Sequence, residues 1–114
     1  MIKTIKIGNR EVKLNANAAT PVFYRAKFNR DLMQDLEPGF TIDGAVEYET
    51  YARLAYIMAQ DAGEEVPEEY TDWLRQFDGL FDLIEALEDL MDVWQRSQKA
   101  TVSSKKKVDQ QSDK

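Results

Sequence analysis

The segment that most constrains the fold is residues 80–98, LFDLIEALEDLMDVWQRSQ, where apolar and acidic side chains recur with helical spacing. An apolar stripe of this width predicts a helix that packs against a core and keeps its opposite face in water. The stripe consists of Leu80, Leu83, Ile84, Leu87, Leu90, Met91 and Trp94. The opposite face carries Asp82, Glu85, Glu88, Asp89 and Asp92. The rest of the chain must therefore supply an apolar surface that covers this stripe.

The N-terminal residues 1–15 predict a β-hairpin as part of that surface. The expected strands, 2–7 and 10–15, are rich in strand-forming residues, and Gly8-Asn9 between them suits a two-residue turn. A two-stranded hairpin is marginally stable alone. Its apolar face must therefore pack on helices, or its edge must pair with another chain.

A helix is expected next over residues 20–36, with Thr20 as its N-cap and Pro21 at its first helical position. Asn29 falls inside the expected apolar arc. It is expected to be either a partly buried amide that bonds the backbone or a polar residue that sets the register of a helix interface. The arc itself holds Val22, Ala26, Leu32, Met33 and Leu36, with Phe23 and Phe28 on its margins.

Two more helices are expected before residue 80, over 45–62 and 67–77. The first should end at Gly63 in a left-handed cap. Its alanines let another helix approach closely, so it should be the central helix. We therefore expect one α+β, mainly α, domain over residues 1–100, a hairpin packed on a bundle of about four helices.

The C-terminal residues 101–114 are rich in Lys and Ser and show no periodicity, which predicts a flexible, disordered tail. Upstream of the tail, residues 37–98 hold sixteen acidic and three basic residues, a net charge of −13. An acidic body of this kind argues against nucleic-acid binding. The cluster Lys105-Lys106-Lys107 has no interleaved aromatic residue and falls short of a basic patch.

Two residue types that are common in enzyme active sites are missing from this sequence, so any catalysis would have to rest on carboxylates, Lys, Tyr, Ser or Thr. It has no histidine and no cysteine, so imidazole acid–base catalysis, thiolate nucleophiles and Cys/His zinc sites are excluded. Its paired carboxylates lie mostly on expected solvent faces, and no calcium-loop or phosphate-loop motif occurs. We expect no enzyme activity, no cofactor and no bound metal. The absence of a long apolar run or signal peptide predicts a cytoplasmic chain that does not span a membrane.

Four aromatic residues in the second half of the chain are candidates for partner binding, because exposed aromatic rings among acidic residues can anchor a protein. The alternative for the two tryptophans is an ordinary place in the core. Phe81 stands out because it projects from the acidic side of the expected 80–98 helix. The candidates are Trp73, Phe77, Phe81 and Trp94.

Several segments together resemble the tail assembly chaperones of long-tailed phages and prophages of Gram-positive bacteria. These are the hairpin, AATPVFYRAKFNRDL, EYETYARLAYIMAQDA, YTDWLRQF and LIEALEDLMDVWQRSQ with its Lys/Ser tail. The resemblance covers about residues 1–107 and rests on patterned apolar and aromatic residues, without a catalytic signature.

The resemblance implies a non-enzymatic protein that binds the tape measure protein, keeps it soluble and helps tail tube protein polymerise around it. Such a chaperone works in the host cytoplasm and is absent from the mature virion. Many are made in two lengths by a ribosomal frameshift, so the codons of Lys105–Lys107 are a candidate slippery site.

Two other function classes fit the composition. The acidic face of residues 80–98 suits an inhibitor that mimics nucleic acid and binds a host DNA-binding enzyme. The chain would also suit a structural tail or connector subunit. Self-association is open in each case, because the hairpin edge can pair between chains.

Overall fold

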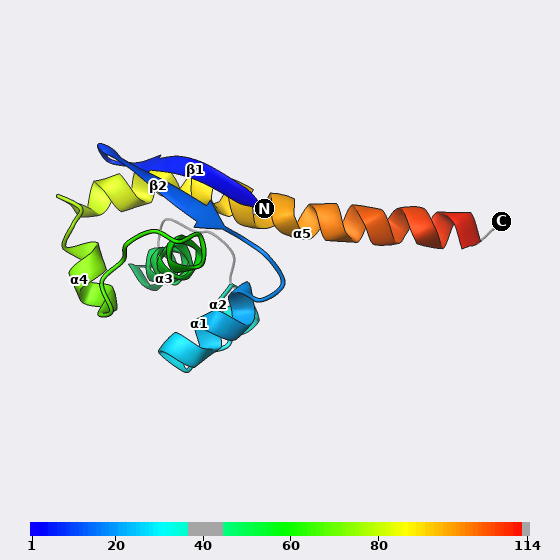
Figure 1. Ribbon diagram of the computed structural model, residues 1–114, viewed down its shortest axis with the longest axis horizontal. Helices are drawn as coiled ribbons and strands as arrows, with labels where there is room; N and C mark the ends of the chain where they lie inside the picture. Colours follow the sequence, from blue (N-terminus) through cyan, green and yellow to red (C-terminus); the bar gives the residue numbers. More distant parts are fainter. Residues whose placement is uncertain (37–44, 113–114) are drawn as a thin grey trace.

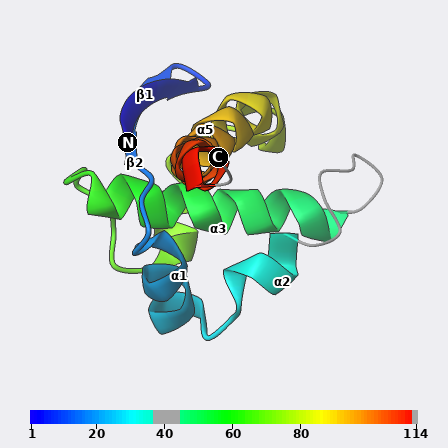
Figure 2. The ribbon, with the colours of Figure 1, turned by 90° about the vertical axis from the view of Figure 1, so that its right-hand side faces the viewer.

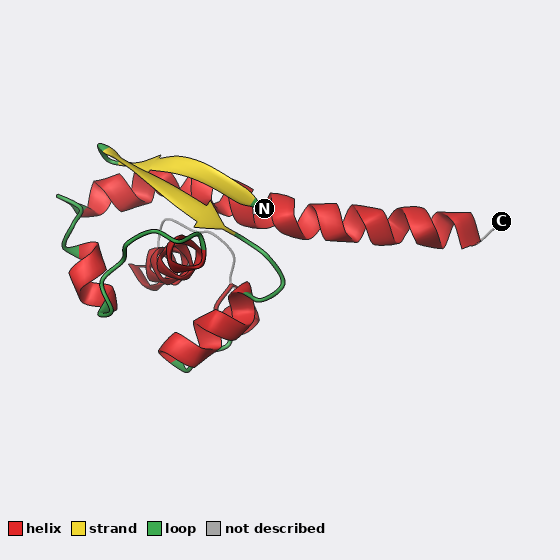
Figure 3. Ribbon diagram, in the orientation of Figure 1, coloured by secondary structure: helices red, strands yellow, loops and turns green. Residues whose placement is uncertain are grey.

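The computed structural model describes the backbone of residues 1–36 and 45–112, and the side chains of residues 1–36 and 48–97. It confirms an α+β, mainly α, architecture with an N-terminal hairpin (Figures 1 and 3). The elements are β1 (Ile2–Ile7), β2 (Arg10–Asn15), α1 (Thr20–Phe28), α2 (Leu32–Leu36), α3 (Ala45–Asp61), α4 (Tyr70–Leu74) and α5 (Leu80–Ser112).

The hairpin has the strand boundaries that the sequence predicts. Its strands pair antiparallel, from Ile2 opposite Asn15 to Ile7 opposite Arg10. Gly8 takes a φ of +63°, which L side chains rarely adopt, and a Cβ there would lie 2.7 Å from Asp82 Oδ2. The apolar face of the hairpin is buried and consists of Ile5, Ile7, Val12 and Leu14.

Helix α3 is the centre of the molecule, as its alanine-rich side predicts. It contacts β2, α1, α2, α4 and α5, whereas α5 packs along β1 (Figure 2). Gly63, at φ +87°, follows α3, and the Glu64 N–H returns to the Ala59 carbonyl at 3.1 Å. The residues of α3 that are buried in the core are Tyr51, Leu54, Ala55, Tyr56, Ile57, Met58 and Ala59.

The prediction of a single helix over 20–36 is wrong, because the helix ends at Phe28 and a second one begins at Leu32. Asn29 adopts φ 55° and ψ 41°, and its N–H bonds the Arg25 carbonyl at 2.8 Å, so it ends α1 as a left-handed C-cap. Its side chain is exposed, which contradicts both expected roles, the buried amide and the register-setting residue. Asparagine tolerates this conformation better than most residues because its short polar side chain bonds locally.

The break also makes the expected apolar arc wrong. Helical phase carried across Asn29 puts Val22 and Met33 toward the core, yet they are 64% and 57% exposed. Within α1 alone, Tyr24 is buried and Phe28 packs on the core, four residues apart on one face. The side of α1 that holds Val22, Phe23 and Ala26 therefore faces solvent.

The start of α1 lies one residue from its predicted position. Ala19 is the N-cap and Thr20 the first helical residue. The buried Thr20 hydroxyl accepts the Asn17 N–H at 3.0 Å, and Asn17 Oδ1 accepts the Ala19 N–H at 2.8 Å. Two short polar side chains thus close the loop that enters α1, without a side-chain bond from the cap residue itself.

The last two helices differ in length from their expected ranges. Helix α4 covers Tyr70–Leu74 within the expected 67–77, and α5 starts at Leu80 as expected but continues to Ser112. No glycine or proline follows Gly79, so nothing in the sequence stops the helix. Residues 101–112 of the stretch expected to be a disordered tail therefore continue α5 and run away from the body (Figure 1), whereas 113–114 lie outside the described residues.

Candidate functional site

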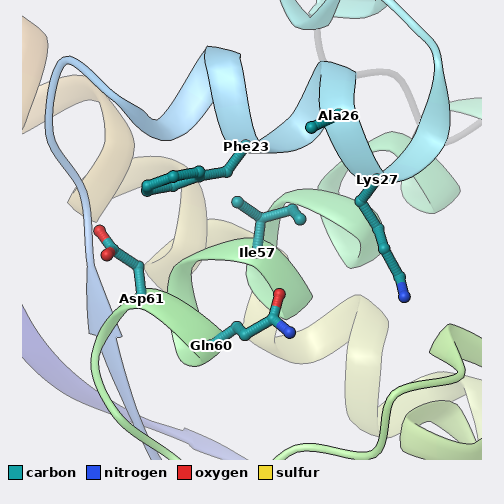
Figure 4. Close-up of a pocket in the computed structure, with 6 residues that line it drawn as sticks. All are labelled: Phe23, Ala26, Lys27, Ile57, Gln60 and Asp61. Carbon is teal, nitrogen blue, oxygen red and sulfur yellow. The ribbon is translucent and has the colours of Figure 1, made fainter.

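The candidate site is a cleft between α1 and α3 with a volume of about 400 Å³ (Figure 4). Its wall on α1 consists of Phe23, Ala26 and Lys27. The facing residues on α3 are Ile57, Gln60 and Asp61. Phe23 is 43% exposed, so much of its ring is available for contact with another molecule. The cleft therefore combines an apolar lining with one acidic and one basic side chain.

The two charged residues of the cleft have partners within the chain. Asp61 Oδ2 accepts a hydrogen bond from Asn17 Nδ2 at 2.7 Å. Lys27 Nζ bonds the Glu68 carbonyl and lies 5.8 Å from the centre of the Tyr56 ring. These contacts fix both side chains in the absence of a partner, which lowers the entropy lost when a partner binds.

A partly buried polar junction holds the α1 wall against α3. Arg53, on α3, donates from Nε to the Tyr24 hydroxyl at 3.0 Å, and this hydroxyl donates to Asp35 Oδ2 at 2.8 Å. Arg30 donates two hydrogen bonds to the same carboxylate, from Nε at 2.7 Å and from Nη2 at 3.0 Å. Arg53 also pairs with Glu49 at 3.0 Å. One carboxylate on α2 thus links α1, α3 and the loop between α1 and α2.

The junction changes the acidity of two of its members. Hydrogen bonds from Arg30 are the main reason that the pKa of Asp35 lies below its ordinary value. The partial burial of Asp35 acts in the opposite direction and raises this pKa. Burial is the main reason that the pKa of the Tyr24 hydroxyl is raised. Asp35 is therefore charged and Tyr24 neutral at neutral pH.

Aromatic rings form a continuous series from α1 to the segment after α4. Edge-to-face contacts join Phe28 to Tyr70, Tyr70 to Tyr56 and Tyr56 to Trp73, with ring centres 5.2–5.6 Å apart. Trp73 continues the series to Phe77 at 5.0 Å. The hydroxyl of Tyr70 is buried without a hydrogen-bond partner among the described residues, and burial raises its pKa. This series anchors α4 on the core.

The structure does not bring the four predicted partner-binding residues together on one surface. Trp73, Phe77 and Trp94 are buried in the core, at 2%, 9% and 6% exposed. Phe81 is the exception, since it projects into solvent at 75% exposed. Partner contact by any of the four stays a prediction, and only Phe81 presents an open ring for it.

Phe23 is the candidate that sequence reasoning missed. A continuous helix puts it on the margin of a buried arc. The signal that identifies it is the pair Tyr24 and Phe28, which defines the buried side of α1 once the helix ends at Asn29. Val22 and Ala26 before Asn29 and Leu32, Met33 and Leu36 after it follow one helical periodicity, which hid that signal.

Comparisons with protein-family models, curated proteins and solved structures found no match for this chain. Among the side chains that the structure describes, no group of three or more acidic residues is arranged to hold a metal ion. In the same part of the chain, no helix has the length and hydropathy that crossing a bilayer requires.

Proposed function

We propose that this protein is a phage tail assembly chaperone that binds and solubilises the tape measure protein and promotes tail tube assembly. The observation that carries the proposal is the cleft between α1 and α3, where Phe23 stands half exposed beside the buried Ile57. An apolar cleft of this kind suits one face of an amphipathic helix, which docks through residues at helical spacing.

The charge of the molecule supports a chaperone that keeps its client in solution. The chain carries a net charge of −6, and complexes coated by acidic protein repel one another. The cleft itself holds one acidic and one basic residue, Asp61 and Lys27, so it does not repel a client of either sign. The proposal places the protein in the host cytoplasm during assembly and outside the finished virion.

Co-expression with the tape measure protein of the same genome tests this function. The soluble fraction of the tape measure protein should rise, and the two chains should co-purify. If soluble yield stays unchanged and the tape measure protein purifies alone, the proposed function is wrong.

Two matched variants locate the client site. Phe23→Glu should abolish the rise in solubility, because it places a charge against the apolar lining of the cleft. Phe81→Glu introduces the same charge at the other phenylalanine that is exposed among the described residues, and it should leave the rise intact. The opposite result would assign the client to α5, and circular dichroism spectra of both variants would confirm that they fold.

A second candidate function rests on the outer face of α5. Glu85, Glu88 and Asp89 are exposed there, and a hollow of about 310 Å³ lies over Glu88, Asp89 and Asp92. An inhibitor that mimics nucleic acid would use this face to bind a host DNA-binding enzyme. If this function is correct, reversing the charge of Glu85, Glu88 and Asp89 should abolish that binding. If the protein is a chaperone, the same variant should still raise the solubility of the tape measure protein.

Two further observations outside the structure would separate the remaining options. A structural tail or connector subunit would appear in mass spectra of purified virions, and a chaperone would not. A longer product made by a ribosomal frameshift, as in many tail assembly chaperones, requires a run of codons at Lys105–Lys107 on which the ribosome can shift and re-pair. A nucleotide sequence without such a run removes the frameshift from this position.

A further inference from the structure

The outer edge of β1 presents backbone groups that the hairpin does not use. Ile7 and Arg10 flank the two-residue turn, and hydrogen-bonded pairs alternate with non-bonded pairs from that point. The bond from the Ala16 N–H to the Met1 carbonyl, 2.9 Å, fits this alternation. Ile2, Thr4 and Lys6 are therefore the residues of β1 that direct their N–H and C=O groups away from β2.

The two edges of the hairpin differ in how they are covered. On β2, the outward N–H of Lys13 donates to Glu64 Oε1 at 2.7 Å. A helix packs on each strand, α3 on β2 and α5 on β1, so the edges differ in this hydrogen bond. On β1, the described residues provide no hydrogen-bond partner for the outward backbone of Ile2, Thr4 or Lys6. All three side chains are exposed, including Ile2 at 64%. An open strand edge of this kind is a template for pairing with another strand.

The sequence of β1 is complementary to itself in one antiparallel register. With Thr4 opposite Thr4 of a second copy, Ile2 lies opposite Lys6 and Lys6 opposite Ile2. These three pairs all use outward-directed backbone groups, and each hydrogen-bonded pair exchanges two bonds, which gives about six bonds. The Thr–Thr pair is favourable across strands. The aliphatic stem of Lys6 would cover the exposed Ile2 side chain.

Charge disfavours the neighbouring register on the N-terminal side. A shift of the pairing by two residues toward the N-terminus keeps the outward-directed backbone groups paired. It places Lys3 directly opposite Lys3 of the other copy, where like charges repel. It also reduces the hydrogen-bonded pairs to two. In the register centred on Thr4, Lys3 lies opposite Ile5, and no two lysines face each other. The neighbouring register on the other side, centred on Ile5, also has no facing lysines, but it keeps only two hydrogen-bonded pairs within β1, because Ile2 would lie opposite Gly8 of the turn.

From these features we infer that the protein forms a two-fold symmetric dimer in which the β1 edges of two copies pair antiparallel about Thr4. The two hairpins then form one four-stranded sheet in the order β2–β1–β1–β2. The interface is isologous, as in most homodimers. This inference goes beyond the proposed function and does not depend on it, because it uses the hairpin and not the α1/α3 cleft.

Sedimentation across a wide range of protein concentration tests the dimer. The wild-type chain should shift from one chain mass to two as concentration rises. Thr4→Lys places two cations opposite each other on the two-fold axis, so this variant should stay monomeric at low salt and regain dimer at high salt. Asn9→Lys adds the same charge at the exposed turn, away from the axis, and should sediment like the wild type. A wild-type chain that is monomeric at every concentration would overturn the inference.

Cysteine crosslinking tests the register, since the chain has no cysteine of its own. In a hydrogen-bonded antiparallel pair the Cα atoms lie about 5.5 Å apart, within the range that a disulfide spans. Thr4→Cys should therefore oxidise rapidly to a dimer of two chain masses. Lys13→Cys, opposite Thr4 on β2 and away from the pairing edge, should crosslink much more slowly. Equal rates for the two variants would exclude the proposed interface.

Discussion

At the scale of single residues, the polar junction around Asp35 is the part of the molecule least visible in the sequence. Tyr24, Asp35 and Arg53 are 29 positions apart at the extremes, and no motif links them. Their contact depends on the break at Asn29, which turns α2 back onto α3. Sequence periodicity finds apolar faces but gives no information about which charged residue a fold will bury. The junction was therefore outside what the sequence could predict.

Replacing Asp35 with Asn should lower the free energy of unfolding by about 2 kcal/mol at neutral pH, because Arg30 and Tyr24 lose a charged acceptor for their hydrogen bonds. Asp72→Asn is the matched control. Asp72 pairs with Arg75 at the surface, where both side chains are well exposed, so the loss there should stay below about 0.5 kcal/mol. Urea unfolding of the three proteins measures both values, and equal losses would contradict a special role for Asp35.

The same variant should change how stability depends on pH. The folded-state pKa of Asp35 is lowered, so the unfolded chain takes up its proton at a higher pH than the folded protein does. The stability from this carboxylate is therefore complete above its ordinary pKa, about 3.9, and is lost as pH falls toward the lowered value. The difference between wild type and Asp35→Asn should shrink below about pH 4 in the same unfolding experiment.

At the scale of elements, prediction succeeded where one local signal acted alone. The hairpin boundaries follow from strand-forming residues around Gly8-Asn9, and the end of α3 follows from Gly63. It failed where two signals competed. Residues 20–36 contain a coherent helical periodicity, and only the left-handed conformation of Asn29 shows that the periodicity is interrupted. The candidate cleft was missed for that reason.

Helix α5 has two parts with different roles. Its first part carries the buried residues Leu83, Leu87 and Leu90, whereas its backbone beyond residue 97 leaves the body (Figure 1). Removing residues 101–114 should therefore leave the urea midpoint unchanged and reduce only the helical circular dichroism signal. A large fall in the midpoint would show that the last part of α5 contacts the body.

At the scale of the whole molecule, both strands, helices α1 to α4 and the first part of α5 contribute to one core. Ile5 of β1, Leu14 of β2, Leu32 of α2, Leu54 of α3 and Trp94 of α5 belong to the same buried cluster. Neither the hairpin nor a single helix has a separate core. The molecule should therefore unfold as one unit, as small single domains usually do.

Two spectroscopic probes can check this cooperativity. Both tryptophans are buried, so their fluorescence reports on the core around α4 and α5. Near-ultraviolet circular dichroism of the tyrosines reports mainly on α1, α3 and α4. The two signals should give the same midpoint in urea, whereas separate midpoints would mean that the molecule does not unfold as one unit.

The left-handed residue at position 29 has a consequence for how this segment chooses its conformation. As one unbroken helix, residues 20–36 would bury the face of Val22, Ala26 and Leu32 in the core. Divided at Asn29, the segment instead buries the face of Tyr24 and Phe28. The two alternatives are mutually exclusive, and each satisfies its own amphipathic pattern. The segment therefore contains two competing amphipathic patterns, and the one set by Tyr24 and Phe28 leaves the face that carries Phe23 exposed to solvent.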